Sequence, residues 1–388
     1  MFGQFQDPRT ANVPPSGGDD TKALQEVFAD DAIRVVGLSG NYNTSEPLVM
    51  RGKSLFVAPQ TMLTYRGKQT DDYLLSFYGA FNAGTLSNLG LYCDHKCRGA
   101  LFSYCTHNRV VDGLLVTRAR QVAVDVVDCW GSSFQNVSIL KSHGIGLRTH
   151  RCNSSSFSQI QVSCMCFWHV DASDDFNHPK NIDLWSFASA NGLDAARAKY
   201  GAALVEDWPD PSDATVLDTA NTPIQTAASD RACMIVGTDC GEQDLTRMTQ
   251  VMLEPNACAD YPVVSIRAYN TILDTVRFEG GYHRESLIEI PRRKSAIRYA
   301  SQVSIQNVAL WTKSKAKRLL RVVGDSHNVR VNGLNAIECL SDSIITLDGG
   351  THVEVDATNI YTYEPTTRLS RDKYIVPVNG ATFSNNVT

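Results

Sequence analysis

The chain has 388 residues, of which 43% are hydrophobic and 20% are charged, and its formal net charge is −5 at neutral pH. This composition is that of a globular protein and excludes a disordered chain. The mild negative charge excludes bulk attraction to nucleic acid or to an anionic membrane. Because the sequence has no apolar run of about 18 residues, we expect no membrane insertion.

The first segment, residues 1–18, is rich in Pro and Gly and predicts an extended arm or linker. It has neither a basic start nor an apolar core, so we expect no signal peptide and folding in the cytoplasm. Asp20 or Thr21 can cap a short helix that follows, in which Leu24 and Phe28 share one apolar face.

A short phrase with apolar residues at alternate positions recurs between residues 86 and 184. The central apolar residues of its five copies are separated by 25, 23, 23 and 22 positions: Leu89, Leu114, Val137, Ile160 and Ile182. Looser copies centre on positions 251, 276, 308, 334 and 360, and strand-like runs lie between successive copies (122–126, 262–266, 287–290, 319–323 and 344–347). Self-similarity at this period predicts a solenoid, and two or three strands per repeat predict the rungs of a β-helix.

The segment after the arm resembles the start of pectate-lyase-like right-handed β-helix proteins, a superfamily that includes bacteriophage tailspikes, polysaccharide lyases and polygalacturonases. The resemblance rests on Gly18-Asp-Asp-Thr-Lys-Ala-Leu-Gln25, then Gly40-Asn-Tyr42 and Pro47-Leu48. It implies an all-β chain, a right-handed parallel β-helix with a short N-terminal capping helix and one helical or loop insertion. We expect an arm over 1–18, a cap over 19–65, a β-helix over 66–363 with the insertion at 186–232, and a C-terminal tail or cap over 364–388.

Two sets of small or polar side chains recur in phase with the repeat, and we expect both to point into the solenoid. The first is an asparagine ladder: Asn88, Asn136, Asn181, Asn307 and Asn359. The second is a stack of reduced cysteines, Cys105, Cys129 and Cys152. Cys93 and Cys97, with Cys105 and His107, superficially resemble a zinc site, but paired short spacings are missing, so we expect no metal and no cofactor.

Several carboxylates are candidates for acid–base chemistry on a sugar. Ser142-His-Gly144 resembles the His-Gly segment of polygalacturonases, although the adjacent aspartates and the Arg-x-Lys of that family are absent. The catalytic candidates are Asp125, Asp128, Asp174, Asp175 and Glu279. The glycan-binding candidates are aromatic, acidic and basic residues: Asp207, Trp208, Tyr282, Trp311, Arg292 and Arg293. The last two belong to a stretch, 290–324, with nine Lys or Arg and no acid, which suits either an anionic ligand or a solvated surface.

The resemblance implies a bacteriophage tailspike or tail fibre subunit that binds a host surface polysaccharide, forms a homotrimer, and attaches to other virion proteins through its N-terminal arm. Whether it also depolymerises the polysaccharide stays open, and an active protein would be a glycoside hydrolase or a polysaccharide lyase. One alternative is a free polysaccharide hydrolase or lyase. Another is a non-enzymatic structural fibre or decoration protein of a virion.

Overall fold

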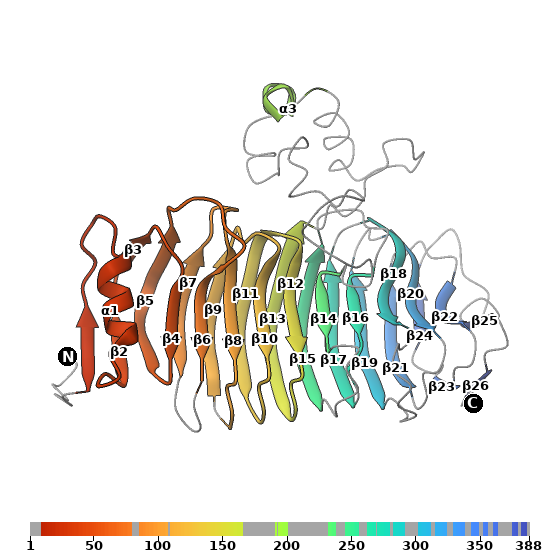
Figure 1. Ribbon diagram of the computed structural model, residues 1–388. Helices are drawn as coiled ribbons and strands as arrows, with labels where there is room; N and C mark the ends of the chain where they lie inside the picture. Colours follow the sequence, from red (N-terminus) through yellow and green to blue (C-terminus); the bar gives the residue numbers. More distant parts are fainter. Residues whose placement is uncertain are drawn as a thin grey trace.

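The protein is an elongated rod of stacked β-strands in a computed structural model, with the N-terminus at one end and the C-terminus at the other (Figure 1). The structure describes residues 9–79, 85–107, 109–165, 191, 193–200, 232–237, 245–255, 262–268, 270–279, 282–291, 302–311, 315–323, 329–337, 343–348, 352–355, 360–363, 375–378 and 382–385. None of the helices within these ranges is long and apolar enough to cross a membrane.

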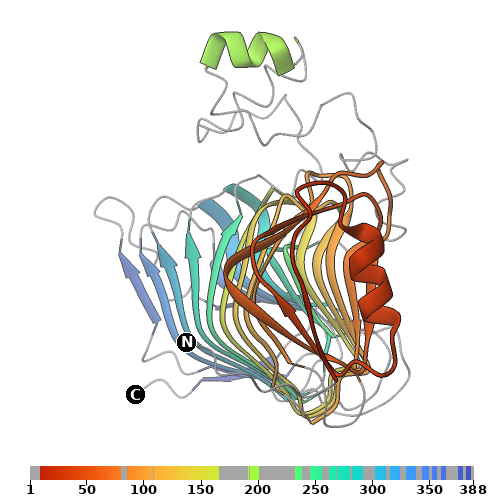
Figure 2. The ribbon, with the colours of Figure 1, turned by 90° about the vertical axis from the view of Figure 1, so that its left-hand side faces the viewer.

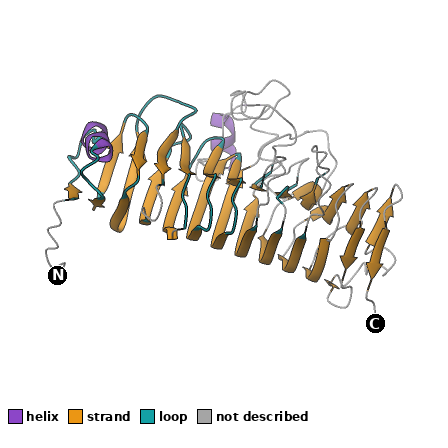
Figure 3. Ribbon diagram, turned by 60° about the horizontal axis from the view of Figure 1, so that its bottom comes forward, coloured by secondary structure: helices purple, strands orange, loops and turns teal. Residues whose placement is uncertain are grey.

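The described strands form two long sheets in which every strand pair is parallel (Figure 3). Sheet A contains β1 (Thr10–Val13), β2 (Val35–Leu38), β3 (Asn41–Thr44), β5 (Ser54–Tyr65), β7 (Leu86–Tyr92), β9 (Arg109–Thr117), β11 (Ser133–His143), β13 (Ser155–Met165), β15 (Thr246–Pro255), β17 (Thr271–Glu279), β19 (Val303–Trp311), β21 (Val329–Ile337), β23 (His352–Val355), β24 (Ile360–Tyr363) and β26 (Thr382–Asn385). Sheet B contains β4 (Leu48–Arg51), β6 (Tyr73–Tyr78), β8 (Arg98–Ser103), β10 (Val122–Val127), β12 (Ile145–His150), β14 (Met234–Val236), β16 (Val264–Ile266), β18 (Tyr282–Ile290), β20 (Lys315–Val323), β22 (Ser343–Asp348) and β25 (Ile375–Val378).

The chain alternates between the sheets, so that successive sheet A strands are neighbours although a sheet B strand lies between them in the sequence. The predicted phrase centres pair across adjacent rungs: Leu89 with Leu114, Leu114 with Val137, and Val137 with Ile160. The strand-like runs between the phrases form β10, β16, β18, β20 and β22 of sheet B. This alternation with parallel pairing confirms the predicted right-handed parallel β-helix.

The fifth copy of the phrase, residues 179–184 with its centre at Ile182, lies outside the described residues. The next described strand of sheet A after β13 is β15, and Ile160 pairs directly with Val251. In the expected insertion, the described helix α3 (Leu193–Tyr200) belongs to neither sheet (Figure 1).

The core is a set of side-chain columns along the rod axis. One column contains Phe102, Phe134 and Phe157, with centroids 5.5 Å apart for the first pair and 4.9 Å for the second. Cys105, Cys129 and Cys152 form another column, each at most 1% exposed and each with a free thiol. The predicted internal cysteine stack is confirmed, and its role is packing because small side chains fit the tight corner there.

The asparagines do not point inward as predicted. Asn88, Asn136 and Asn307 are exposed and have φ values of 56°, 55° and 52°, in the left-handed region. The bend turns each side chain outward, where the amide of Asn136 donates to Asp112 of the neighbouring rung at 2.8 Å. Asn tolerates this conformation better than most residues, which explains its recurrence. Asn181 and Asn359 lie outside the described residues.

The N-terminal end is closed by α1 (Thr21–Ala29), which lies across the first rungs (Figure 2). Leu24 and Phe28 are buried on its inner face, as predicted, and close the apolar core at this end. Within the predicted arm, β1 pairs in parallel with β2 and so extends sheet A.

Candidate active site at the edge of sheet A

Two glutamates lie side by side where the strands of sheet A end. Glu254 and Glu279 occupy equivalent positions in β15 and β17, because Leu253 pairs with Phe278 immediately before them. Both side chains are partly exposed, while Leu253 and Phe278 point into the core. Side chains alternate across a strand, so the two carboxyl groups share the outer surface of the rod.

The carboxyl groups of Glu254 and Glu279 are close enough to interact with each other. The pKa of Glu254 is raised, first because burial disfavours its charged form and then because of the negative charge of Glu279 and the hydrogen bond between them. Arg277 acts in the opposite direction and forms an ion pair with Glu279. The raised pKa makes Glu254 the better candidate of the two for an acid.

The neighbouring rungs continue this column of positions. Ser163 pairs with Glu254 on the N-terminal side, and Trp311 pairs with Glu279 on the C-terminal side. β18 begins at Tyr282, three residues after Glu279, so its backbone starts at the same corner of the rod. The structure thus brings three of the predicted site residues, Glu279, Tyr282 and Trp311, to one region, although it describes only the backbone for the last two.

Asp125 lies on the other sheet and is held in an ion-pair network. Arg148 donates to Asp125 from Nε at 3.1 Å and from Nη2 at 2.6 Å, and the hydroxyl of Tyr73 donates at 2.6 Å. Burial raises the pKa of Asp125, but the hydrogen bonds and charge of Arg148 outweigh it, and the net pKa is lowered. A carboxylate in this state has no proton to give, so Asp125 orients Arg148 rather than acting as an acid.

Asp128 also pairs with an arginine, Arg151, at 2.5 Å, and lies near the corner where sheet B ends. Neither aspartate lies on the sheet that carries Glu279. The remaining acidic and aromatic candidates, Asp174, Asp175, Asp207 and Trp208, fall outside the described residues, as do Arg292 and Arg293. Within the basic stretch, Arg321 pairs with Glu289 and Asp348 across two rungs, so this cation is neutralised within the sheet.

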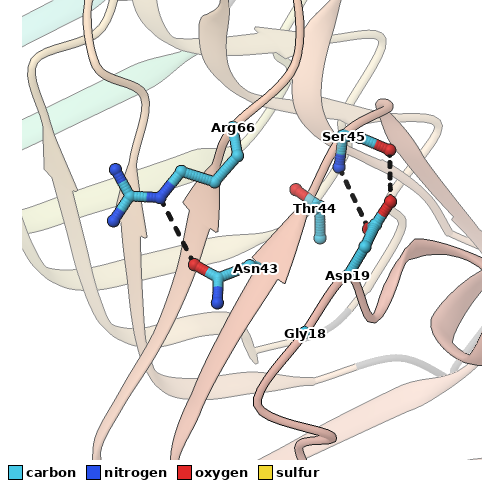
Figure 4. A pocket seen from close by; sticks show the side chains of 6 residues that line it. All are labelled: Gly18, Asp19, Asn43, Thr44, Ser45 and Arg66. Carbon is cyan, nitrogen blue, oxygen red and sulfur yellow. Dashed lines mark hydrogen bonds between the residues drawn. The ribbon is translucent and has the colours of Figure 1, made fainter.

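A hollow of about 420 Å³ opens beside the N-terminal helix (Figure 4). Its lining residues are Gly18, Asp19, Asn43, Thr44, Ser45 and Arg66. Hydrogen bonds from Ser45 and Thr21 lower the pKa of Asp19 to about 2. These bonds join the start of the helix to the residue after β3, so the polar cluster holds the N-terminal cap on the rod.

In the described part of the chain, no three His, Cys, Asp or Glu residues lie close enough together to hold a metal ion. Cys93 and Cys97 are buried free thiols, and burial raises the pKa of Cys93 well above its usual range. A protonated thiol is a poor ligand, so these cysteines act as core residues.

Sequence reasoning missed Glu254, although the signal was present. Glu254 and Glu279 each follow directly after a copy of the repeated phrase and are 25 positions apart, which is one rung. Parallel rungs place equal positions side by side. Aligning the phrases and comparing the residue after each would therefore have paired the two glutamates.

No protein-family model matches the chain, and no curated protein is significantly similar to it in sequence. Solved structures with a similar course of the backbone include an alginate lyase from Paenibacillus sp. str. FPU-7, with 10% identity, coverage of 96% of this chain and 98% of that chain, and a TM-score of 0.46. For the catalytic domain of a GH87 α-1,3-glucanase in complex with nigerose, the identity is 12%, the match covers 99% of this chain and 70% of that chain, and the TM-score is 0.48. For the Dettilon tailspike protein, the identity is 9%, the match covers 95% of this chain and 68% of that chain, and the TM-score is 0.42. At these values we transfer no function, and the site is interpreted from its own geometry.

Proposed function

We propose that this β-helix binds a polysaccharide across the C-terminal ends of the strands of sheet A and hydrolyses it with Glu254 and Glu279. The observation that carries the proposal is the pair of neighbouring carboxyl groups on the outer surface, with the pKa of Glu254 raised. Glycoside hydrolysis uses two carboxyl groups in different environments that lie about 5 Å or more apart, so in the proposed complex the bound sugar separates the pair.

In the proposed reaction, Glu254 gives its proton to the glycosidic oxygen as the bond from that oxygen to the anomeric carbon breaks. Glu279 has the second role, either activating a water that attacks the anomeric carbon or attacking it directly before water releases the product. The configuration of the first product, observed by NMR, distinguishes the two. Arg277 forms an ion pair with Glu279 and so positions its carboxylate.

The long axis of the rod suits a polymeric substrate better than a small one. Nearer the N-terminal end of the rod, Tyr92 and Thr117 pair at the ends of β7 and β9. Arg118 donates to the hydroxyl of Tyr92 at 2.5 Å, so both polar groups are fixed at the surface. A chain of sugars lying across several rungs would meet this row of polar groups.

The first experiment replaces Glu254 with Gln, which keeps the shape and removes the acid. We expect release of reducing ends from bacterial capsular polysaccharide or lipopolysaccharide to fall by about 10² to 10⁴. Asp274→Asn is the matched control, since this carboxylate lies in the same strand and hydrogen-bonds Asn307 at 2.9 Å. Equal activity of Glu254→Gln and wild type would refute the role of Glu254, and no release by wild type from any substrate would refute hydrolysis.

We further propose that the chain is a subunit of a bacteriophage tailspike or tail fibre, assembled as a homotrimer and attached to the virion through its N-terminal arm. A rod that carries its site on the side, away from both ends, leaves the ends available for attachment. The mass of the intact chain in solution tests the assembly: a trimer is expected, and a monomer at micromolar concentration would contradict it. Binding of host cells by the Glu254→Gln variant separates a receptor-binding spike from a free hydrolase.

A further inference from the structure

Exposed apolar side chains gather at one corner of the rod, where the chain passes from sheet B to sheet A. Among the described residues, the exposed large hydrophobic side chains are Val49, Phe56, Tyr104, Trp130 and Leu245. Three of these five lie at this corner: Tyr104 after β8, Trp130 between β10 and β11, and Leu245 directly before β15. Tyr104 is 61% exposed and Trp130 is 52% exposed, which is unusual for such large side chains.

The register of the rungs places Tyr104 and Trp130 close together along the rod. Trp130 pairs with Thr106 of the preceding rung and with Asn153 of the following rung. Tyr104 directly precedes the buried Cys105, and Trp130 directly follows the buried Cys129. Tyr104 and Trp130 therefore occupy adjacent rungs, offset by two positions along the chain.

Both aromatic residues are held by backbone hydrogen bonds between rungs. The amide of Trp130 donates to the carbonyl of Cys105 at 3.0 Å, and its carbonyl accepts from the amide of His107 at 2.7 Å. The amide of Tyr104 donates to Val127 at 3.1 Å. The backbone that carries the two rings is thus held in place by the neighbouring rungs.

Polar groups lie between and beside the rings. Asp128 and Arg151 occupy the positions equivalent to Tyr104 in the next two rungs and form an ion pair at 2.5 Å. Asn153 and Ser154 are exposed in the rung beyond Trp130. A flat ring covers the apolar face of a sugar, and neighbouring amide, hydroxyl and carboxylate groups bond its hydroxyls.

We propose that this corner, centred on Tyr104 and Trp130, is a second, non-catalytic carbohydrate-binding site that holds a neutral segment of an oligosaccharide. The charges of Asp128 and Arg151 cancel within their ion pair, so no net charge selects an ionic ligand here. A second copy of the chain is a poorer fit. Two half-exposed aromatic side chains supply on the order of 200 Å² of apolar contact, whereas a stable interface needs roughly 800 Å² from each partner.

The proposed second site is separate from the glutamate pair. Tyr104 and Trp130 precede the starts of β9 and β11, whereas Glu254 and Glu279 lie at the ends of β15 and β17. The start and the end of such a strand are about 25 Å apart, because about eight residues, each spanning about 3.3 Å, separate them. A polymer held at the second site would stay near the rod after cleavage at the first.

The test uses the full chain in the Glu254→Gln background, with an array of defined bacterial oligosaccharides as the probe. Adding Trp130→Ala or Tyr104→Ala is expected to weaken binding about tenfold. Phe56→Ala is the matched control, because Phe56 is an exposed aromatic residue, 54% exposed, away from this corner. It should leave binding unchanged, and unaltered melting temperatures would show that all variants fold.

A further comparison uses the chain with Glu254 intact. Trp130→Ala is expected to cleave a short oligosaccharide at the wild-type rate, which separates this site from the glutamate pair. Array signals that survive both corner substitutions, or no array signal at all, would overturn the proposal. A change in the mass of the Trp130→Ala variant in solution, with glycan binding unchanged, would assign the corner to contacts between copies instead. Loss of array signals in a chain that cleaves nothing would support this site and refute the proposed hydrolysis.

Discussion

The neighbours of a carboxyl group raise or lower its pKa, and this chain contains an example of each: the pKa of Asp125 is lowered and that of Glu254 is raised. Arg148 and Tyr73 hold Asp125 as an anion in a nearly closed environment. The pKa of Glu254 is raised instead, first by burial and then by the neighbouring carboxyl group of Glu279. The residue type is therefore a weak guide to chemistry, and the partner decides which carboxyl group can donate a proton.

Arg277 offers a direct test of the acid. Its positive charge lowers the pKa of Glu254, so Arg277→Gln is expected to raise that pKa further. Glu254 would then stay protonated to higher pH, and the alkaline limb of the pH–rate profile would move upward by up to about one pH unit. The measurement is the rate of reducing-end release over a range of pH. Arg247→Gln, at the far end of β15, is the control, and a downward shift for Arg277→Gln would contradict the assigned roles.

The sequence predicted one half of this site. Glu279 was a candidate because an aromatic residue, Tyr282, comes soon after it in the sequence. No aromatic residue comes directly after Glu254, which is followed by Pro255. Asp125 was also a candidate from the sequence. The arginine that pairs with it, Arg148, is 23 residues away in the sequence, so the ion pair could not be read from the residues around Asp125. Ion pairs between rungs depend on register, which a single sequence shows only where the repeat is regular.

At the scale of the strand, each rung of sheet A bends at one fixed position. Residues with φ near 55° occur directly before the central apolar residue in most rungs: Asn88, Asn136, Gln159, Gln250, Thr275 and Asn307. Gly113 and Gly333 have φ values of 90° and 68° at the same position. The bend lets one strand contribute apolar side chains on both sides of it to the same core.

Gly113 is expected to be sensitive to substitution. A Cβ atom there would lie 3.0 Å from Oδ1 and 3.2 Å from the backbone nitrogen of Asn88, in a conformation that is costly for other residues. We expect Gly113→Ala to lower the free energy of unfolding by about 1–2 kcal/mol. Chemical denaturation measures it, with Gly18→Ala as the control, because the nearest atom to that Cβ is 3.7 Å away. Equal stability of the two variants would show that the bend relaxes.

The element order was largely predictable, while the direction of individual polar side chains was not. Periodic apolar residues such as Leu114 and Val137 predicted the strands because burial requires that period. The recurrence of asparagine is compatible both with a left-handed bend and with an inward ladder, so the sequence alone did not decide the direction of these side chains.

Across the whole rod, a buried histidine pair links folding to pH. The rings of His95 and His143 stack with centroids 3.7 Å apart and planes 5° apart. Burial lowers the pKa of His95 to about 2, and the positive charges of His143 and Arg118 act in the same direction. In the unfolded chain a histidine has a pKa near 6.5. The unfolded state therefore binds more protons between these two values, and acid favours it.

We accordingly expect stability to be constant above about pH 6.5 and to fall below it. The contribution of His95 is at most about 1.4 kcal/mol for each pH unit. His95→Phe keeps a ring in the stack and should flatten the slope of unfolding free energy against pH between about 6 and 4. His107→Phe, at an exposed histidine, should leave the slope unchanged. A slope that is the same in wild type and His95→Phe would exclude His95 as its source.

The exact phase between rungs has a consequence for how such a protein changes over generations. Ser163 stands in the same row as Glu254 and Glu279, one rung away, and Trp311 continues the row on the other side. A single codon change at a row position would set a new side chain beside an existing pair without altering the backbone. The position of a catalytic pair can then drift along the rod in steps of about 4.8 Å, and two descendants could keep one fold while cutting their polymers at different rungs.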